Sequence, residues 1–256
     1  MKLSKWGAEV FRETGAISRF TGLFFREVFS PRYEFKEFFK QCFLIGYKSL
    51  PLIGLTGFIM GLVLILQLRP TLLQYGVEAK LPAMVSLSIV REIGPVISAL
   101  IFAGKIGSSI GAELGSMRVT EQIDSMEVSG TNPFKYLVVT RVLACTLMLP
   151  VLAVLSDAIG IYGSYIGFNI RSAMSPQLFI KQVFATLEFQ DVIPAIVKTY
   201  FFGFAVGIVG CYKGYFSKNG TAGVGTAANS AVVLCSVLIF VIDLIIVQIA
   251  DLLGYN

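Results

Sequence analysis

Long apolar runs separated by short polar segments dominate the chain. A helix that crosses a hydrocarbon core of about 30 Å needs roughly 20 apolar residues. Residues 49–68, the stretch between Arg141 and Arg171, and the run from 219 to 250 meet this requirement, the last two with one aspartate each. Two further runs are interrupted: residues 81–104 contain Arg91, Glu92 and Pro95, and residues 192–212 contain Lys198. The pattern therefore predicts five membrane-spanning helices, at about residues 49–68, 81–104, 142–170, 192–212 and 231–250.

The first 46 residues have an amphipathic pattern instead. Basic residues recur at every seventh position from Lys5 to Arg26, beside Trp6 and other apolar residues at helical spacing. A basic stripe next to such a face is typical of a helix that lies in the membrane interface, although a helix packed on other protein has the same pattern. A second, Phe-rich amphipathic stretch begins at Phe35. We therefore expect an interfacial region over residues 1–46 and a transmembrane domain over residues 47–256.

Composition supports an all-α polytopic membrane protein. Of the 256 residues, 55% are hydrophobic and only 14% are charged, against roughly 25% charged in soluble domains. The chain contains no histidine, which excludes a Ser-His-Asp triad and a histidine-ligated metal site. The 4 cysteines are scattered in apolar surroundings and form no C-x-x-C pair. We expect no metal and no cofactor.

The basic residues predict the topology. Placing the N-terminus in the cytoplasm puts fifteen Lys and Arg residues on that side and four on the other, with two inside spans. Such a bias follows the positive-inside rule. An odd number of spans then places the C-terminus on the opposite side of the membrane, outside the cytoplasm. The sequence pI of 9.0 is therefore a topology signal, and it does not indicate nucleic-acid binding.

Glycines recur one helical turn apart within the apolar runs. Small residues at this spacing allow membrane helices to approach closely, which fits a tight bundle or a dimer. The four pairs and one triplet are Gly57/Gly61, Gly107/Gly111/Gly115, Gly163/Gly167, Gly203/Gly207 and Gly210/Gly214.

Arg91 and Glu92 lie inside the second predicted span. A charge at mid-bilayer costs about 2.5–3.5 kcal/mol on insertion scales, so it normally faces a cavity or a partner. Adjacent helical residues point about 100° apart and cannot simply neutralise each other, so the two charges should address different surfaces. Pro95 also removes the hydrogen bond to the Arg91 carbonyl. A kinked polar segment of this kind suits the wall of a substrate cavity, although snorkelling at the membrane edge is the simpler alternative.

The segment after the second span is acidic. Residues 112–130 have a net charge of −3, with partly helical spacing of apolar residues. An acidic amphipathic helix on the cytoplasmic side would suit docking of a soluble partner, whereas a solvated loop would have a similar composition.

One catalytic pattern occurs, at residues 107–111, which read G-S-S-I-G around Ser109. A G-x-S-x-G elbow requires a base, and a chain without histidine cannot supply the usual one. A Walker phosphate loop is also missing from the sequence. We therefore expect that the chain is not an enzyme.

The run GPVISALIFAGKIGSSIGAELGSMRVTEQIDSMEVSGTNPFKYLVVTRVLA, residues 94–144, resembles the signature region of MlaE/YrbE-type permeases. Its most specific parts are the motifs E-L-G at 113–115 and V-T-E-Q-I-D at 119–124. The resemblance covers about four fifths of the chain. Members of this family are inner-membrane subunits of bacterial ABC transporters, which move phospholipids or other lipids between the inner and outer membranes. The resemblance therefore implies a multi-pass protein of the bacterial inner membrane.

The resemblance also implies partners and site residues. The permease would form a homodimer, dock on two cytoplasmic ATPase subunits, and meet a periplasmic MCE-domain protein. Arg91 and Glu92 match a charged pair near the lipid cavity, and Asp243 matches a family aspartate. The expected cavity-wall residues are Leu68, Leu72 and Tyr75, and the expected ATPase-coupling residues are Glu113, Arg118, Glu121, Asp124 and Glu127.

Two other function classes remain open on the residues alone. An ion-coupled secondary transporter could use the charged residues of the spans, which are Arg91, Glu92, Asp157, Lys198 and Asp243. An intramembrane enzyme would have to use Ser109 as its nucleophile.

Overall fold

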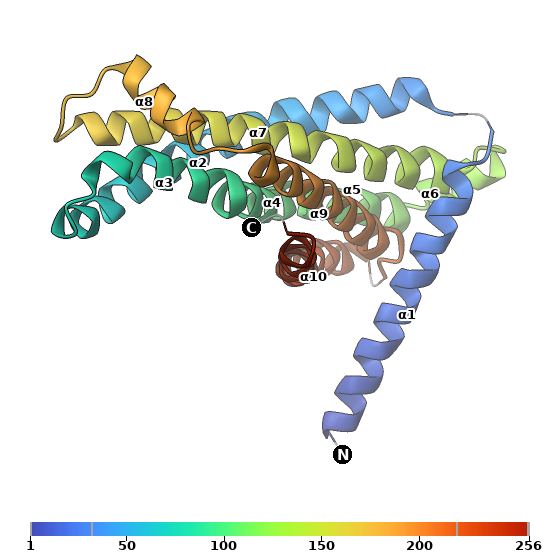
Figure 1. Ribbon diagram of the computed structural model, residues 1–256. Coiled ribbons are helices and arrows are strands. Elements are labelled where there is room, and N and C mark those ends of the chain that lie inside the picture. The colour runs from blue at the N-terminus through green and yellow to red at the C-terminus, as the bar shows by residue number, and fades with distance from the viewer. Residues whose placement is uncertain (1, 32, 219, 255–256) are drawn as a thin grey trace. The chain divides into compact units, whose positions relative to one another are not determined.

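The computed structural model describes residues 2–31, 33–218 and 220–254, with side chains from residue 11 onward (Figure 1). Every regular element in these ranges is helical, as the apolar patterning predicts. In chain order the elements are α1 (Lys2–Val28), α2 (Phe35–Gln74), η1 (Glu78–Lys80), α3 (Leu81–Ser88), η2 (Ile89–Ile93), α4 (Gly94–Phe102), η3 (Ala103–Gly107), α5 (Ser108–Val119), α6 (Gln122–Val128), η4 (Phe134–Val139), α7 (Thr140–Asn169), α8 (Pro176–Phe184), α9 (Phe189–Tyr215) and α10 (Gly220–Leu252).

Five helical segments in the described ranges are long and apolar enough to cross a membrane, which confirms the predicted number of spans. They are Phe35–Gln74, Glu78–Val119, Phe134–Asn169, Phe189–Tyr215 and Gly220–Leu252. The helices extend well beyond the predicted limits. The Phe-rich stretch that begins at Phe35 is not a separate helix, because α2 continues through it and through Pro51 and Pro70. Membrane helices tolerate such prolines because neighbouring groups satisfy the freed carbonyls.

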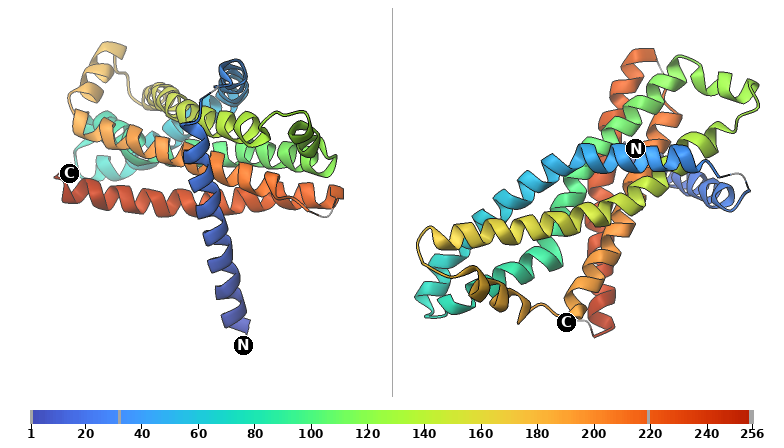
Figure 2. Two further views of the ribbon diagram at one scale, coloured as in Figure 1. Left: turned by 90° about the vertical axis from the view of Figure 1, so that its right-hand side faces the viewer. Right: turned by 90° about the horizontal axis from the view of Figure 1, so that it is seen from above.

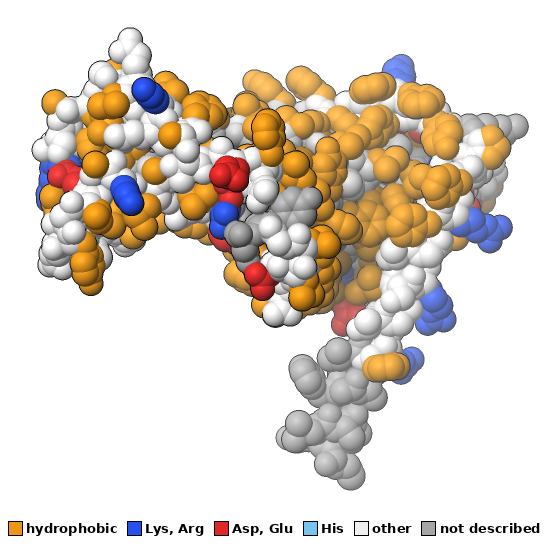
Figure 3. All heavy atoms as spheres, viewed as in Figure 1, with side chains coloured by type: hydrophobic (Ala, Val, Ile, Leu, Met, Phe, Trp, Pro, Cys, Tyr) orange, Lys and Arg blue, Asp and Glu red, His pale blue; other side chains and the backbone are white. Residues whose placement is uncertain are grey.

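The chain forms two compact units, which several long helices share. The first unit comprises Met1–Ile45, Ala103–Cys145 and Phe204–Ser236, and the second comprises Gly46–Phe102, Thr146–Gly203 and Val237–Asn256. On the face drawn in Figure 3, hydrophobic side chains are widely exposed and charged side chains are sparse, as expected for a surface that meets lipid.

In the second unit, α2 and α7 run alongside each other (Figures 1 and 2) and touch through their glycines. A Cβ on Gly57 would lie 2.5 Å from the Ser156 hydroxyl oxygen, and a Cβ on Gly61 would overlap the Gly160 carbonyl oxygen. A Cβ on Gly163 would likewise overlap the Phe58 carbonyl oxygen. The glycine motifs predicted to permit close approach therefore face each other within one chain.

In the first unit, glycines also allow η3 and α5 to pack closely against α9. A Cβ on Gly210 would lie 3.2 Å from the Gly107 carbonyl oxygen, and one on Gly214 would lie 2.9 Å from the Gly111 carbonyl oxygen. The motifs read from the sequence at 107–115 and 210–214 are thus partners across one helix contact.

The second half of α1 packs on this unit through aromatic rings. Phe20 is buried, with ring centroids 5.0 Å from Phe134 and 5.6 Å from Tyr212, and Phe24 lies 5.5 Å from Phe204. Arg12, Arg19 and Arg26 are exposed, as are Phe11, Phe25 and Phe29. The helix therefore buries one aromatic stripe against protein and leaves basic and apolar groups outside. The side chains of Lys5 and Trp6 lie outside the described residues.

Candidate functional site

Arg91 and Glu92 lie in the π-helical turn η2, which ends at Ile93, two residues before Pro95. The Gly94 N–H donates to the Ile89 carbonyl, five residues earlier. Since Pro95 has no N–H to continue the α-helical ladder, a wider turn before it accommodates the interruption. Such π-helical turns are rare in proteins as a whole, but those that occur are often found at functional sites. This one carries both Arg91 and Glu92.

Arg91 pairs with Asp191, a buried residue in the first turn of α9. The same carboxylate accepts a hydrogen bond from the backbone N–H of Glu188 (2.8 Å), just before the helix starts. Asp191 therefore caps α9 and holds Arg91 at the same time. Sequence reasoning missed Asp191, because an acid at a helix start is ordinary and nothing local indicates a partner 100 residues away.

Glu92 takes a different partner, as the angular separation from Arg91 predicts. The Lys198 Nζ lies 2.7 Å from a Glu92 carboxylate oxygen and 3.0 Å from a carboxylate oxygen of Asp243. Lys198 is almost fully buried. Asp243, for which the sequence suggested no physical role, is therefore the second counter-ion of a lysine inside a membrane-length helix.

A cavity of about 180 Å³ opens beside these pairs, between η2, α9 and α10. Charged residues line one side of it, and Ile246, Val247 and Ala250 supply an apolar wall. An adjoining apolar cavity of about 190 Å³ shares Ala195 and is lined by Asp157. One carboxylate oxygen of Asp157 is buried without a hydrogen-bond partner. The structure thus joins a polar and an apolar hollow at one place in the second unit.

The cavity-wall candidates lie elsewhere in the second unit. Leu68 and Leu72 pack against a buried cluster that includes Leu81, Phe168 and Phe179, and Tyr75 is exposed after the end of α2. None of the three lines the polar cavity. Their role as a lipid-facing wall stays a prediction.

The sequence suggested that the acidic segment from Glu113 to Glu127 forms one helix, and this expectation is wrong. Helix α5 ends at Val119, and Glu121 adopts a left-handed conformation (φ 57°) before α6 begins. Among the described residues, Glu121 is the sole non-glycine with a positive φ, a conformation that strains a side chain with a Cβ. An Arg118–Asp124 ion pair joins the two helices. The exposed acids of these two helices and the turn between them are Glu113, Glu121, Asp124 and Glu127.

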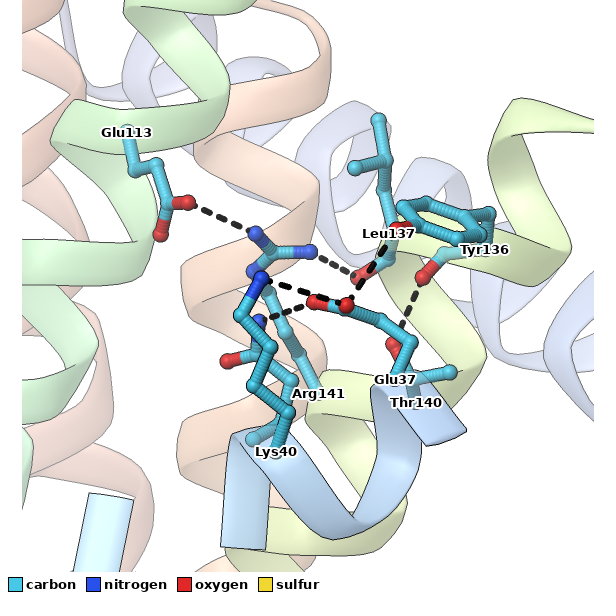
Figure 4. Close-up of polar contacts among 8 residues, drawn as sticks. Glu37, Lys40, Glu113, Tyr136, Leu137, Thr140 and Arg141 are labelled. Atoms are coloured by element: carbon cyan, nitrogen blue, oxygen red, sulfur yellow. Dashed lines mark hydrogen bonds and ion pairs between the residues drawn. The ribbon is translucent and has the colours of Figure 1, made fainter. Parts of the chain in front are cut away.

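Glu113 has a partner inside the protein. The buried Arg141 donates to a Glu113 carboxylate oxygen (2.7 Å) and to the Leu137 carbonyl (3.0 Å) (Figure 4). Nearby, the Glu37 carboxylate accepts hydrogen bonds from Gln41 (2.7 Å) and Tyr136 (3.2 Å). Glu113 therefore balances a buried guanidinium, whatever else its half-exposed side chain contacts.

We expect Glu113→Gln to lower the free energy of unfolding by about 3 kcal/mol, because it leaves Arg141 buried without a counter-ion. Asp124→Asn is the matched control, since it breaks an exposed ion pair that is worth about 1 kcal/mol or less. Unfolding of the purified variants in mild detergent would measure both. Equal losses in the two variants would refute the structural role of Glu113, and partial rescue by Arg141→Gln would support it.

Residues 38–249, which include all five spans almost completely, match the family described as Permease MlaE. The chain belongs to the MlaE permease family. It is 36% identical over 237 residues to a probable ABC transporter permease protein of Rickettsia typhi, covering 93% of this chain and 92% of that protein. It is also similar to two other probable ABC transporter permease proteins. The one from Synechocystis is 34% identical over 239 residues, which cover 93% of this chain and 89% of that protein. The one from Pyropia yezoensis is 33% identical over 211 residues, which cover 81% of this chain and 79% of that protein.

An ABC transporter permease of the MlaE family is a transport subunit, which agrees with the geometry around Ser109. The segment 107–111 lies within continuous helix formed by η3 and α5, whereas a nucleophile elbow requires a sharp strand-to-helix turn. The catalytic pattern in the permease is therefore a helix-packing sequence, with Gly107 and Gly111 against α9 and α10.

Proposed function

We propose that this permease moves phospholipid or a related lipid between the inner and outer membranes of a bacterium, powered by a separate ATPase subunit. The match to the MlaE permease family over residues 38–249 carries the proposal. The sequence itself lacks a Walker phosphate loop, so in this proposal ATP is hydrolysed on another chain. The protein would span the inner membrane with its N-terminus in the cytoplasm and its C-terminus in the periplasm, following the distribution of Lys and Arg.

The polar cavity is the cargo site in this proposal. Intramembrane charges normally face a cavity, a pathway or one another. Here Arg91 and Glu92 line a hollow whose opposite wall is apolar. A lipid has the same division between a polar headgroup and apolar chains.

The turn between α5 and α6 is the ATPase-docking element in this proposal. It exposes Glu121, Asp124 and Glu127, while Ile123 is fully buried and anchors α6. An exposed acidic surface on a helix fixed by one buried residue can receive a force and pass it to the spans. Glu113, which pairs with Arg141, would act behind this surface by holding α5.

We expect the double variant Glu121→Lys, Asp124→Lys to lose stable association with the ATPase subunit and at least about tenfold of the lipid-stimulated ATP hydrolysis. Reversing two exposed charges replaces attraction by repulsion across the docking surface. Co-purification and ATPase assays on the reconstituted complex would measure both. Unchanged assembly and hydrolysis would show that the coupling role is wrong.

Glu121→Gly is the control for backbone effects. Glycine adopts a positive φ without strain, so this variant keeps the turn and removes only the side chain. A fold at least as stable as the parent, with weakened ATPase binding, would assign the effect to the carboxylate.

A homodimer and a periplasmic MCE-domain protein complete the proposed assembly. Helix α10 supports the dimer, because much of its apolar surface is exposed, including Val237, Phe240 and Leu244. In a bilayer such a face contacts lipid or another helix. A five-span chain encloses little volume by itself, so a pathway between two copies is the natural arrangement.

The ion-coupled carrier remains the alternative, and the surplus of carboxylates around Lys198 is the observation in its favour. Membership in a family of ABC transporter permeases favours the ATP-driven function. Liposomes that contain the permease without an ATPase distinguish the two. Cargo movement driven by an ion gradient alone would support the carrier.

A further inference from the structure

The exposed ends of the two charge pairs define the ligand chemistry of the polar cavity. In the Arg91–Asp191 pair and in the Glu92–Lys198 pair, one side chain is buried and the other is partly exposed. Asp191 and Lys198 are the buried members, with side chains 3% and 2% exposed. Arg91 and Glu92 are the open members, at 38% and 48%. A ligand that enters this cavity therefore meets a guanidinium and a carboxylate on neighbouring residues of one π turn.

The charge balance around the cavity is negative. Arg91 and Lys198 are the two cations of the cluster among the described residues, and Asp191, Glu92 and Asp243 each pair with one of them. These three carboxylates outnumber the two cations by one. Buried carboxylates without a counter-ion are costly. A ligand that brings a positive charge to the Glu92 side relieves this surplus, whereas a purely anionic ligand adds to it.

We propose that the cavity binds a zwitterionic phospholipid headgroup, with its phosphate on Arg91 and its ammonium on Glu92. This inference rests on the proposed lipid-transport function and names the class of headgroup. Asp191 engages one side of the guanidinium, through Nε and one terminal nitrogen, and a guanidinium has five N–H donors. Donors therefore remain for a phosphate, which guanidinium groups bind well.

Lys198 is a poor partner for the phosphate. It is buried, and its ammonium is already shared between Glu92 and Asp243. The apolar wall of Ile246, Val247 and Ala250 lies beside the charged groups, where the chains of a lipid would continue. The cavity thus places one available cation and one available anion next to apolar surface.

The test is lipid selection by the purified permease complex. The complex is incorporated into vesicles that contain equal amounts of phosphatidylethanolamine and phosphatidylglycerol, and then re-extracted; the retained lipids are quantified by mass spectrometry. We expect phosphatidylethanolamine to be retained about tenfold more than phosphatidylglycerol, because one additional hydrogen bond to a charged group changes the affinity by about this factor. Soluble glycerophosphoethanolamine should compete poorly, because it lacks the chains. Competition as strong as that of the lipid would overturn the assignment of a lipid as ligand.

Glu92→Gln is the decisive variant. Lys198 keeps Asp243 as a counter-ion in this variant, so the fold should persist. We expect the preference to disappear while phosphatidylglycerol binding is retained. Arg91→Gln should weaken both lipids, since both carry the phosphate. Glu34→Gln, which removes an exposed acid from the other compact unit, is the matched control and should keep the preference.

The outcomes separate the two proposals. Equal retention of both lipids by the parent, or a preference that survives Glu92→Gln, would overturn the headgroup assignment while leaving lipid transport intact. Failure of the parent to retain any lipid would instead overturn the proposed function.

Discussion

Lys198→Met is expected to destabilise the permease by about 3–5 kcal/mol, the usual cost of breaking a buried ion pair by removing one partner. Lys198 is almost fully buried and is the counter-ion of both Glu92 and Asp243. Without its charge, two carboxylates remain in a membrane-length bundle with no cation bonded to them. The yield of folded protein and the unfolding midpoint in detergent would measure the loss.

The chain offers a control and a rescue for this prediction. Lys181→Met makes the same substitution at an exposed position on α8 and should change stability little. Neutralising both partners in the Lys198→Met background, with Glu92→Gln and Asp243→Asn, should restore much of the lost stability, because no uncompensated charge remains. A single variant as stable as the parent would contradict the buried network.

Gly61→Ala is expected to prevent α2 from packing on α7. The added methyl group would overlap the Gly160 carbonyl oxygen, which is backbone and cannot rotate away. Overpacking typically costs about 1–3 kcal/mol, and a clash with backbone should reach or exceed the upper value. Thermal unfolding of the purified protein, or its loss from the membrane fraction, would report this.

Gly104→Ala is the matched control. No atom outside its own helix lies within 4 Å of a Cβ built there, and alanine favours helix more than glycine does. We therefore expect Gly104→Ala to be neutral or slightly stabilising. Similar losses in both variants would mean that general helix sensitivity, and not the α2–α7 contact, explains the result.

Much of the fold was predictable, because a bilayer leaves a chain few alternatives. Each span must satisfy its own backbone hydrogen bonds as a helix, so apolar length alone gave the number of spans. Glycine spacing also indicated which helix faces approach closely. The pattern could not reveal that Gly57/Gly61 face α7 or that Gly210/Gly214 face α5, since spacing describes one helix and a contact involves two.

The helix limits were less predictable. The Phe-rich start of α2 has an amphipathic pattern, yet it continues the first span without a break. Conversely, the acidic segment reads as one helix, yet Glu121 turns the chain between α5 and α6. A left-handed residue that is not glycine has no local signature, because surrounding packing stabilises it.

The candidate site, too, was predictable only in part. The apolar pattern was enough to place Arg91 and Glu92 within a span and to predict that they address different surfaces, because a charge in an apolar run is conspicuous and adjacent helical residues diverge. The pairing of Asp191 with Arg91 and of Asp243 with Lys198, by contrast, became visible in the folded chain alone. Asp191 lies 100 positions from Arg91, and Asp243 lies farther away still along the chain. Electrostatic pairing in a low-dielectric interior depends on distance in space and not on separation along the chain.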